Sequence, residues 1–244
     1  MDIGDDQIIS IGLVLALLLL SKVRDLLDNS GLFAATLTGL TVSLMGHWTW
    51  LISLFTFLII GSLATKWKLD EKKLLSLEEA NEGLRSWKNV LANGGAVSIV
   101  AIYNFLFPGQ EWIYFAAIAS ISVALSDTLA SEIGSLDTRT RSITTLQSVP
   151  AGTNGGMSPT GTVAALFGAI LISIVGVIFS PDDSKISEIQ LLSLLSLIGW
   201  LGCQVDSILG AVLENRGYLG KHSVNFLATF SGSLMAIIFY YQFL

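Results

Sequence analysis

The chain has 244 residues, of which 52% are hydrophobic and 13% are charged, and its formal net charge is −6. A water-soluble globular domain has about 25% charged residues. The composition therefore excludes such a domain and indicates a chain that lies mainly in lipid, with no nucleic-acid partner expected.

Eight apolar runs are long enough to cross a bilayer as helices, which takes roughly 17–25 residues. They cover residues 7–23, 30–46, 48–65, 90–107, 112–133, 159–179, 189–213 and 224–244. An open sheet would leave backbone groups without partners in lipid, so helices are predicted. The fold class is therefore an all-α, polytopic membrane bundle of about eight transmembrane helices, forming a single transmembrane domain over residues 1–244.

The basic residues predict the orientation of this bundle. Twelve of the thirteen Lys and Arg residues follow the first, third, fifth or seventh run, and Lys185 alone lies on the other side. Loops rich in Lys and Arg stay in the cytoplasm. We therefore expect the loops after the odd-numbered runs to be cytoplasmic and both termini to be non-cytoplasmic.

The first long cytoplasmic segment, residues 66–89, mixes leucines with charges and predicts a short amphipathic helix on the bilayer surface. A solvated charged connector is the alternative. The segment leads into "GLRSWKNVLANGG", with Arg85 and Lys88 just before the fourth span and Asn89 and Asn93 just inside it. Even-numbered spans begin at the cytoplasm, where their unpaired N–H groups and positive dipole ends favour phosphate.

Three acids interrupt the apolar runs. Asp127 and Glu132 lie in "SDTLASEIG" of the fifth span, and Asp206 lies in "VDSILGAVLE" of the seventh. An ionised carboxylate in a span costs about 2.5–3.5 kcal/mol, and Mg²⁺ takes carboxylates together with phosphate oxygens. We predict that these acids bind Mg²⁺, provided that the fifth helix ends or bends before Glu132; a carboxylate paired with Lys or Arg is the alternative.

The second long cytoplasmic segment, residues 134–158, is predicted to be a phosphate-binding loop and lid. Its alternating "SITTLQSV" favours a small hairpin, and it ends in "AGTNGGMSPTGT". Ser158 is expected to be the N-cap of the sixth span, with Pro159 in the first helical position. Glycines let backbone amides approach a ligand closely. The predicted phosphate contacts are Thr153, Asn154, Gly155, Gly156, Ser158, Gly161 and Thr162, with Arg141 earlier in the loop and Asn225 in "VNFLATFSG" of the eighth span. An ordinary glycine-rich turn is the alternative.

These motifs, in this order over residues 83–232, resemble those of the transmembrane protein 19-like family. A plastid member of that family is a phytyl-phosphate kinase, and the family is distantly similar to CTP-dependent polyprenol kinases. The resemblance implies Mg²⁺-dependent transfer of a phosphoryl group from a nucleoside triphosphate, expected to be CTP, to a membrane-embedded prenyl monophosphate of the phytyl or geranylgeranyl type. Leu84 stands where a second basic residue is expected, and Met157 where a smaller β-branched residue is expected.

The predicted site residues then have different expected roles. The three carboxylates are expected to hold the metal, and Arg85, Lys88 and Arg141 to neutralise phosphates. The glycine-rich loop is expected to cradle the triphosphate, while Asn89, Asn93 and Asn225 would orient phosphate or metal-bound water. The acceptor phosphate is already anionic, so no strong general base is needed.

Two other classes of membrane protein remain to be compared with this interpretation. A transporter of a small ion or phosphorylated metabolite would also use buried acids, although its site would lie near the bilayer midplane. A CDP-alcohol phosphotransferase would carry a DGxxAR…GxxxDxxxD pattern, which the sequence lacks.

Overall fold

The computed structural model describes residues 4–77, 83–181 and 187–243. Residues 78–82 of the predicted connector and Lys185 lie outside these ranges. The described elements are α1 (Asp5–Val23), α2 (Asn29–Thr41), η1 (Val42–Gly46), α3 (Trp48–Lys66), α4 (Leu69–Leu74), α5 (Trp87–Leu106), α6 (Trp112–Gly134), β1 (Arg141–Ser142), β2 (Gly156–Met157), α7 (Pro159–Ile178), α8 (Glu188–Leu209), η3 (Gly210–Glu214) and α9 (Lys221–Phe243).

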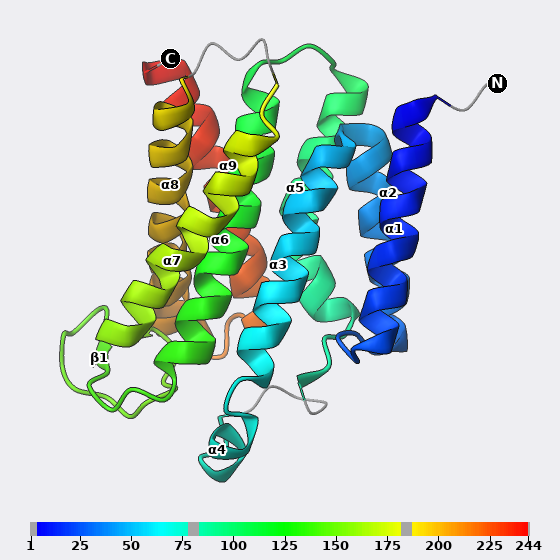
Figure 1. Ribbon diagram of the computed structural model, residues 1–244. Helices are drawn as coiled ribbons and strands as arrows, with labels where there is room; N and C mark the ends of the chain where they lie inside the picture. The colour runs from blue at the N-terminus through cyan, green and yellow to red at the C-terminus, as the bar shows by residue number, and fades with distance from the viewer. Residues whose placement is uncertain (1–3, 78–82, 182–186, 244) are drawn as a thin grey trace.

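The bundle confirms the predicted all-α membrane fold. Seven of the described helices are long and apolar enough to cross a membrane. The α2 helix continues into the π-helical turn η1, and together they make the short second span that the sequence predicts. Figure 1 shows the long helices running alternately up and down, with both ends of the chain at the top and with α4 and β1 at the bottom. We call this lower end the hairpin end.

Helix α6 forms the centre of the bundle and packs against α3, α5, α7, α8 and α9. Small residues on α6 and on its neighbours allow this close packing. A Cβ on Gly202 of α8 or on Gly232 of α9 would overlap the side chain of Val123, and a Cβ on Gly134 would lie 2.8 Å from the Cα of Gly161. Close backbone approach through small residues is a common way to associate helices in membranes.

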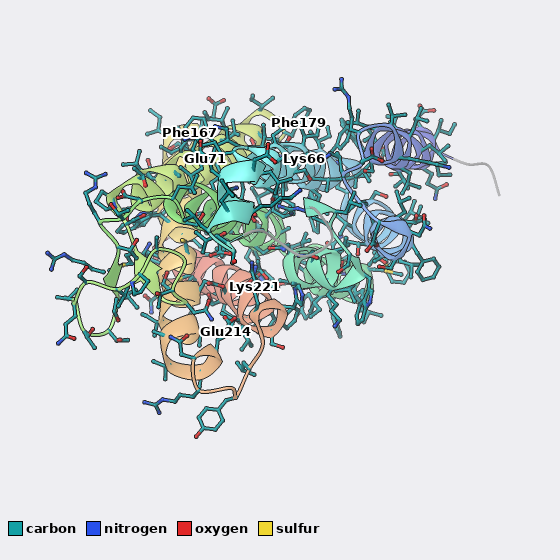
Figure 2. All side chains as sticks on the ribbon, turned by 90° about the horizontal axis from the view of Figure 1, so that it is seen from below. Lys66, Glu71, Phe167, Phe179, Glu214 and Lys221 are labelled. Carbon is teal, nitrogen blue, oxygen red and sulfur yellow. The ribbon has the colours of Figure 1, made fainter. Side chains whose placement is uncertain are left out.

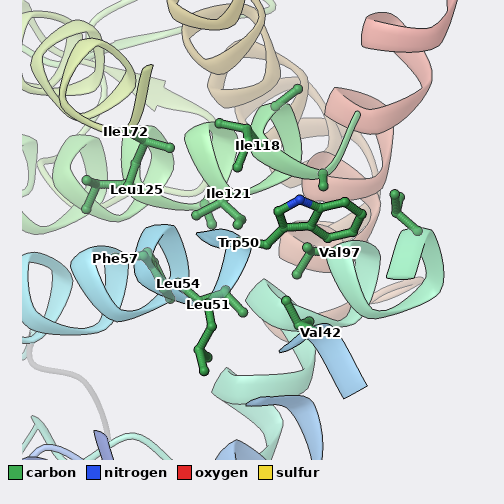
Figure 3. Close-up of a cluster of buried hydrophobic side chains, with 14 of the residues drawn as sticks. Val42, Trp50, Leu51, Leu54, Phe57, Val97, Ile118, Ile121, Leu125 and Ile172 are labelled. Atoms are coloured by element: carbon green, nitrogen blue, oxygen red, sulfur yellow. The ribbon is translucent and has the colours of Figure 1, made fainter. Parts of the chain in front are cut away.

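Large apolar side chains fill the space between α6 and its neighbours (Figure 3). Trp50, Leu54 and Phe57 of α3 face Ile118 and Ile121 of α6, with Val42, Val97, Leu125 and Ile172 completing the cluster. Other apolar side chains point outward, including Leu15 and Leu19 of α1, which are 61% and 67% exposed. A contiguous outward apolar surface fits a lipid environment.

The two long segments that are predicted to be cytoplasmic differ in detail from the prediction. The connector does contain a helix, but α4 has six residues and turns Lys72 inward, while Leu74 and Leu75 are exposed. In the second segment, β1 pairs with Gly156 and Met157 of the later glycine-rich stretch rather than within "SITTLQSV". The stretch "SITTLQSV" also folds back on itself, because Arg141 and Ser148 form an isolated antiparallel bridge and the Ser142 N–H donates to the Gln147 carbonyl oxygen at 2.9 Å. The two ends of the segment are joined by the pairing of β1 with β2.

Candidate functional site

A polar cavity of about 310 Å³ lies at the hairpin end of the bundle, between α6, α8, α9 and the residues that precede α7. We call it the acidic cavity. Asp127, Asp206 and Glu214 line it together with the glycine loop, residues 152–158. Gly161, Thr162, Lys221 and Asn225 also line it. Small-molecule pockets span roughly 300–1,000 Å³, so the cavity has the size of a binding site.

The glycine loop is fixed against the end of α8. Gly155 has φ +74° and lies so close to the turn η3 that a Cβ there would overlap Ala211 and come within 2.6 Å of the Ser207 carbonyl oxygen. The Asn215 side-chain amide donates to the Asn154 carbonyl oxygen at 3.0 Å. Thr153 bonds back to the Pro150 carbonyl oxygen at 2.7 Å. The loop backbone is thereby held beside the segment that carries Asp206 and Glu214.

Gly155→Ala is expected to destabilise the protein by more than the roughly 1–2 kcal/mol that a left-handed backbone alone costs a residue with a Cβ. The added methyl group would also push the loop away from η3. Gly217→Ala is the matched control, because Gly217 has the same φ of +74° but open space around it. Thermal unfolding in detergent measures both, and equal losses in the two variants would contradict the packing of the loop on η3.

The start of α7 confirms the predicted cap but is already saturated with donors and acceptors. Ser158 accepts from the Gly161 N–H at 3.1 Å, and Pro159 occupies the first turn. The Thr160 N–H and hydroxyl donate to Asp137 at 3.3 and 2.9 Å. Arg139 chelates the same carboxylate and holds the pKa of Asp137 well below its usual range. The N–H groups at the start of α7 are therefore already bonded within the protein.

Two carboxylates from neighbouring helices, Asp127 and Asp206, line the acidic cavity, and that of Asp206 is only partly satisfied. Asp127 and Asp206 interact with each other across the space between α6 and α8, and the charge of Glu214 also acts on Asp206. Asn225 donates to Asp127 at 3.5 Å. The buried Oδ2 atom of Asp206 has no hydrogen-bond partner. A buried acceptor without a partner costs about 1–3 kcal/mol, and a bound ion or water is one way to satisfy it.

One basic residue faces these acids. Lys221, at the start of α9, acts electrostatically on both Asp206 and Glu214. Figure 2, seen from the hairpin end, shows Glu214 and Lys221 close to each other. Over the described ranges, no three His, Cys, Asp or Glu side chains are grouped to hold a metal ion by themselves. The Asp127–Asp206 pair instead suits Mg²⁺, which binds through one or two carboxylates with phosphate oxygens and water.

Glu132 does not join this pair, which corrects the expected set of three metal ligands. Helix α6 continues unbroken to Gly134, and five residues on a helix turn the side chain by about 140°. Glu132 instead lies 2.6 Å from the Lys72 ammonium and accepts from the Thr65 hydroxyl at 2.9 Å. We therefore assign Glu132 to an ion pair between α6 and α4, which is the alternative raised from the sequence.

Five other predicted site residues also do not line the acidic cavity. They are Arg85, Lys88, Asn89, Asn93 and Arg141. Arg85 is buried between α3 and α6, and its guanidinium stacks over the Phe57 ring at 5.0 Å. Lys88 is exposed beside Trp87.

Asn89 caps the first turn of α5 through Ser86, and Asn93 donates to the Asn89 carbonyl oxygen. Arg141 is exposed on the hairpin and donates to the Leu146 carbonyl oxygen.

Sequence reasoning missed several residues of the cavity. Glu214 lies just beyond the predicted seventh span, eight residues or about two turns after Asp206, and was not assigned to the site, yet it lines the cavity. Ser76 and Leu77 also line the cavity. A Cβ on Gly152 would overlap Leu77, so the end of the α4 segment covers the glycine loop. No local sequence pattern predicts this contact between Leu77 and Gly152, which are far apart in the chain.

Comparison with known proteins places these features in a family. Residues 12–233 match a family that is described as "Integral membrane protein DUF92". An uncharacterised membrane protein of Methanocaldococcus jannaschii is 34% identical over 95% of this chain and 93% of its own length. In Arabidopsis thaliana, Protein PGR is 30% identical over 81% of this chain and 75% of its own length, and the chloroplastic Protein VTE6 is 30% identical over 87% of this chain and 65% of its own. No solved structure matches. The chain therefore belongs to the DUF92 family of integral membrane proteins, which agrees with the motif resemblance.

Proposed function

We propose that this protein is a prenyl-monophosphate kinase, which transfers a phosphoryl group from a nucleoside triphosphate, with CTP as the expected donor, to a prenyl monophosphate in the membrane. The observation that carries the proposal is the buried, partnerless oxygen of Asp206 beside Asp127, in the cavity that the glycine loop also lines. The likeness to a family that includes phytyl-phosphate kinase supports the choice of acceptor. We further propose that the hairpin end faces the cytoplasm, which supplies the nucleotide.

The residues of the cavity fit this chemistry. Phosphoryl transfer depends on positioning and on neutralising the phosphate charge more than on covalent catalysis. Mg²⁺, when bound, would neutralise charge on the phosphates. Asp127 and Asp206 would hold it, and Asn225 orients Asp127. The backbone of the glycine loop, fixed by η3, would position the triphosphate, and Lys221 adds a positive charge at the rim.

The placement of the cavity favours a kinase over a transporter. Transporter sites lie near the bilayer midplane, between broken helices. Asp127 is about two turns from the end of α6, and Asp206 is in the last turn of α8, so the acids lie toward the hairpin end. An opening at one end suits a soluble nucleotide that meets a lipid head group.

A transfer assay on detergent-purified protein tests the proposal. CTP, ATP, UTP and GTP, each labelled on the γ-phosphate, would be supplied separately with Mg²⁺ and geranylgeranyl or phytyl monophosphate. We expect labelled prenyl diphosphate, most rapidly from CTP, and its loss when Mg²⁺ is chelated. Folded protein that transfers no label from any donor would overturn the kinase assignment, and ion or metabolite flux into proteoliposomes would then identify a transporter.

A further inference from the structure

The acidic cavity has to receive two phosphates if it is the site of transfer. Reacting atoms lie about 3–3.5 Å apart before a bond forms, so the acceptor phosphate has to share this cavity with the donor. The lining reaches into the bundle as far as Ala165 of α7 and Cys203 of α8, which are both buried. A prenyl phosphate keeps its chain in lipid, so its route to this depth leads between two helices.

The cavity is closed on the side where α7 meets α6. A Cβ on Gly161 of α7 would lie 3.0 Å from the Ala130 carbonyl oxygen of α6. Further from the hairpin end, a Cβ on Gly168 would lie 2.9 Å from the Leu125 carbonyl oxygen. The two helices therefore touch backbone to backbone beside the cavity, which leaves no room for a lipid chain between them.

The wall that α8 contributes is on the side of this helix that faces α7. Cys203, Gln204 and Ser207 line the cavity, and the Ser207 carbonyl oxygen borders Gly155 of the glycine loop. Each residue turns a helix by about 100°, so Val205 points to the opposite side of α8, and it does not line the cavity. Along α8, the cavity therefore extends toward the seam between α7 and α8.

Two close contacts limit this seam. Away from the hairpin end, a Cβ on Gly199 of α8 would lie 2.9 Å from the Cβ of Ala169 of α7. At the hairpin end, a Cβ on Gly155 would lie 2.6 Å from the Ser207 carbonyl oxygen. Gly199 and Ser207 are separated by about 12 Å along the helix. We call the stretch of seam between these two contacts the side window. Figure 1 shows that α7 is inclined to α8.

Both edges of the side window carry a residue that lies between the cavity and the lipid-facing surface. Thr162 of α7 lines the cavity and is half-buried, and Leu166, one turn further along, is 44% exposed. Gln204 of α8 also lines the cavity and is half-buried, and Ile208, one turn away, is 46% exposed. Residues four apart share one face of a helix. The cavity therefore reaches the outer surface of the bundle at this window.

Gln204 supplies a hydrogen-bond donor at the window. Its side-chain amide donates to the Trp200 carbonyl oxygen at 3.4 Å. An amide carries two N–H groups, so a second donor is available for a ligand. Gln204 precedes Asp206 by two residues on α8, and both line the cavity. A neutral amide can bind a phosphate oxygen here without placing another cation beside the metal.

We propose that the prenyl phosphate enters the acidic cavity from the bilayer through the side window, with its phosphate at Gln204 and its chain over the outer faces of α7 and α8. The inference rests on the proposed function for the identity of the acceptor. The nucleotide enters from the hairpin end, past the glycine loop. An oxygen of the prenyl phosphate then bonds to the γ-phosphorus, the bond to the bridging oxygen breaks, and the nucleoside diphosphate leaves by the hairpin end.

Photolabelling tests the route without requiring turnover. Geranylgeranyl monophosphate with a diazirine on its first isoprene unit is the probe, and unlabelled geranylgeranyl monophosphate is the competitor. We expect competitor-sensitive labelling of peptides from α7 or α8. Labelling confined to other helices, or labelling that the competitor does not reduce, would overturn the proposal.

Leu166→Trp is expected to obstruct the side window. The larger ring should weaken labelling and raise KM for geranylgeranyl monophosphate by about tenfold or more, the discrimination that steric fit in a hydrophobic pocket supplies. KM for the nucleotide should not change, because the nucleotide enters elsewhere. Leu234→Trp on α9 is the matched control, since Leu234 is also 46% exposed, and it should alter neither quantity. Labelling that survives Leu166→Trp would remove the window as the route.

Gln204→Leu tests the phosphate contact by itself. Loss of a hydrogen bond to a charged group should raise KM for the prenyl phosphate by about tenfold or more, again with KM for the nucleotide unchanged. A residue that only supports the fold would instead lower thermal stability and leave the two KM values in their wild-type ratio. That second result would remove Gln204 from the acceptor site.

The outcomes separate this inference from the proposed function. Protein that transfers phosphate but is labelled on helices other than α7 and α8 would leave the kinase standing and remove the side window. Protein that is labelled at the window, with labelling lost in Leu166→Trp, but that transfers no phosphate would keep the window as a prenyl-phosphate site and remove the kinase.

Discussion

Asp206→Asn is expected to lower the rate of phosphoryl transfer by about 10²–10³-fold, the range found when one electrostatic contact to a transition state is removed. The buried Oδ2 atom of Asp206 has no hydrogen-bond partner, and we propose it as a metal ligand. An amide at this position cannot neutralise a divalent cation. The same change removes one of two interacting carboxylates, so without Mg²⁺ the variant should unfold at an equal or higher temperature than wild type.

Activity and stability should therefore move in opposite directions, which is the pattern of residues kept for function. Asp127→Asn should behave alike, with the rate and the Mg²⁺ concentration for half-maximal activity measured in the same transfer assay. Glu188→Gln, at the far end of α8, is the matched control and should change neither quantity. Wild-type rates and Mg²⁺ dependence in Asp206→Asn would remove the acid pair from the mechanism.

Glu132→Gln is expected to destabilise the protein by about 3–5 kcal/mol, the usual effect of removing one partner of a buried ion pair. Lys72 is 1% exposed and donates to Glu132 and to the Ala64 and Thr65 carbonyl oxygens, which end α3. Without the carboxylate, the ammonium stays buried with its charge uncompensated. Unfolding in detergent with a chemical denaturant measures the loss.

A double variant distinguishes this ion pair from a metal site. Lys72→Met together with Glu132→Gln should recover much of the stability, because no buried charge remains. The exposed pair Lys68–Glu71 is the control, and Glu71→Gln should cost at most about 1 kcal/mol. If Glu132→Gln instead kept its stability and lost Mg²⁺ affinity, Glu132 would be a metal ligand after all.

The sequence predicts the bundle well because lipid imposes a simple rule on it. Runs of apolar residues near 20 long must be helices that cross, and α3, α5, α6 and α7 begin or end within a few residues of the expected bounds. Ser158 and Pro159 fix the start of α7 through local chemistry alone. The placement of Asp127, Asp206, Asn225 and the glycine loop around one cavity follows from the shared end of their helices.

The remaining site assignments depend on the rotation of helices and on contacts between distant segments. Glu132 differs from Asp127 in the direction it faces, and its partner Lys72 is 60 residues away in the sequence. Arg85 appeared to belong with the phosphates of the acidic cavity, yet its place is decided by the α1–α2 connection, which has no motif of its own. Hydrophobic patterns cannot resolve such contacts when every face of a helix is apolar.

The segment of residues 135–157 leaves the bundle at the end of α6 and returns to it at the start of α7, and these two points are in contact. The Ser158 hydroxyl bonds the Gly134 carbonyl oxygen at 3.2 Å, and Gly134 and Gly161 touch. With its base fixed, the loop can lengthen at its tip at low cost, since doubling a loop costs only about 0.6 kcal/mol. Insertions among residues 143–148 should therefore be tolerated, because they would lengthen the tip of the segment without separating the two helix ends that hold its base.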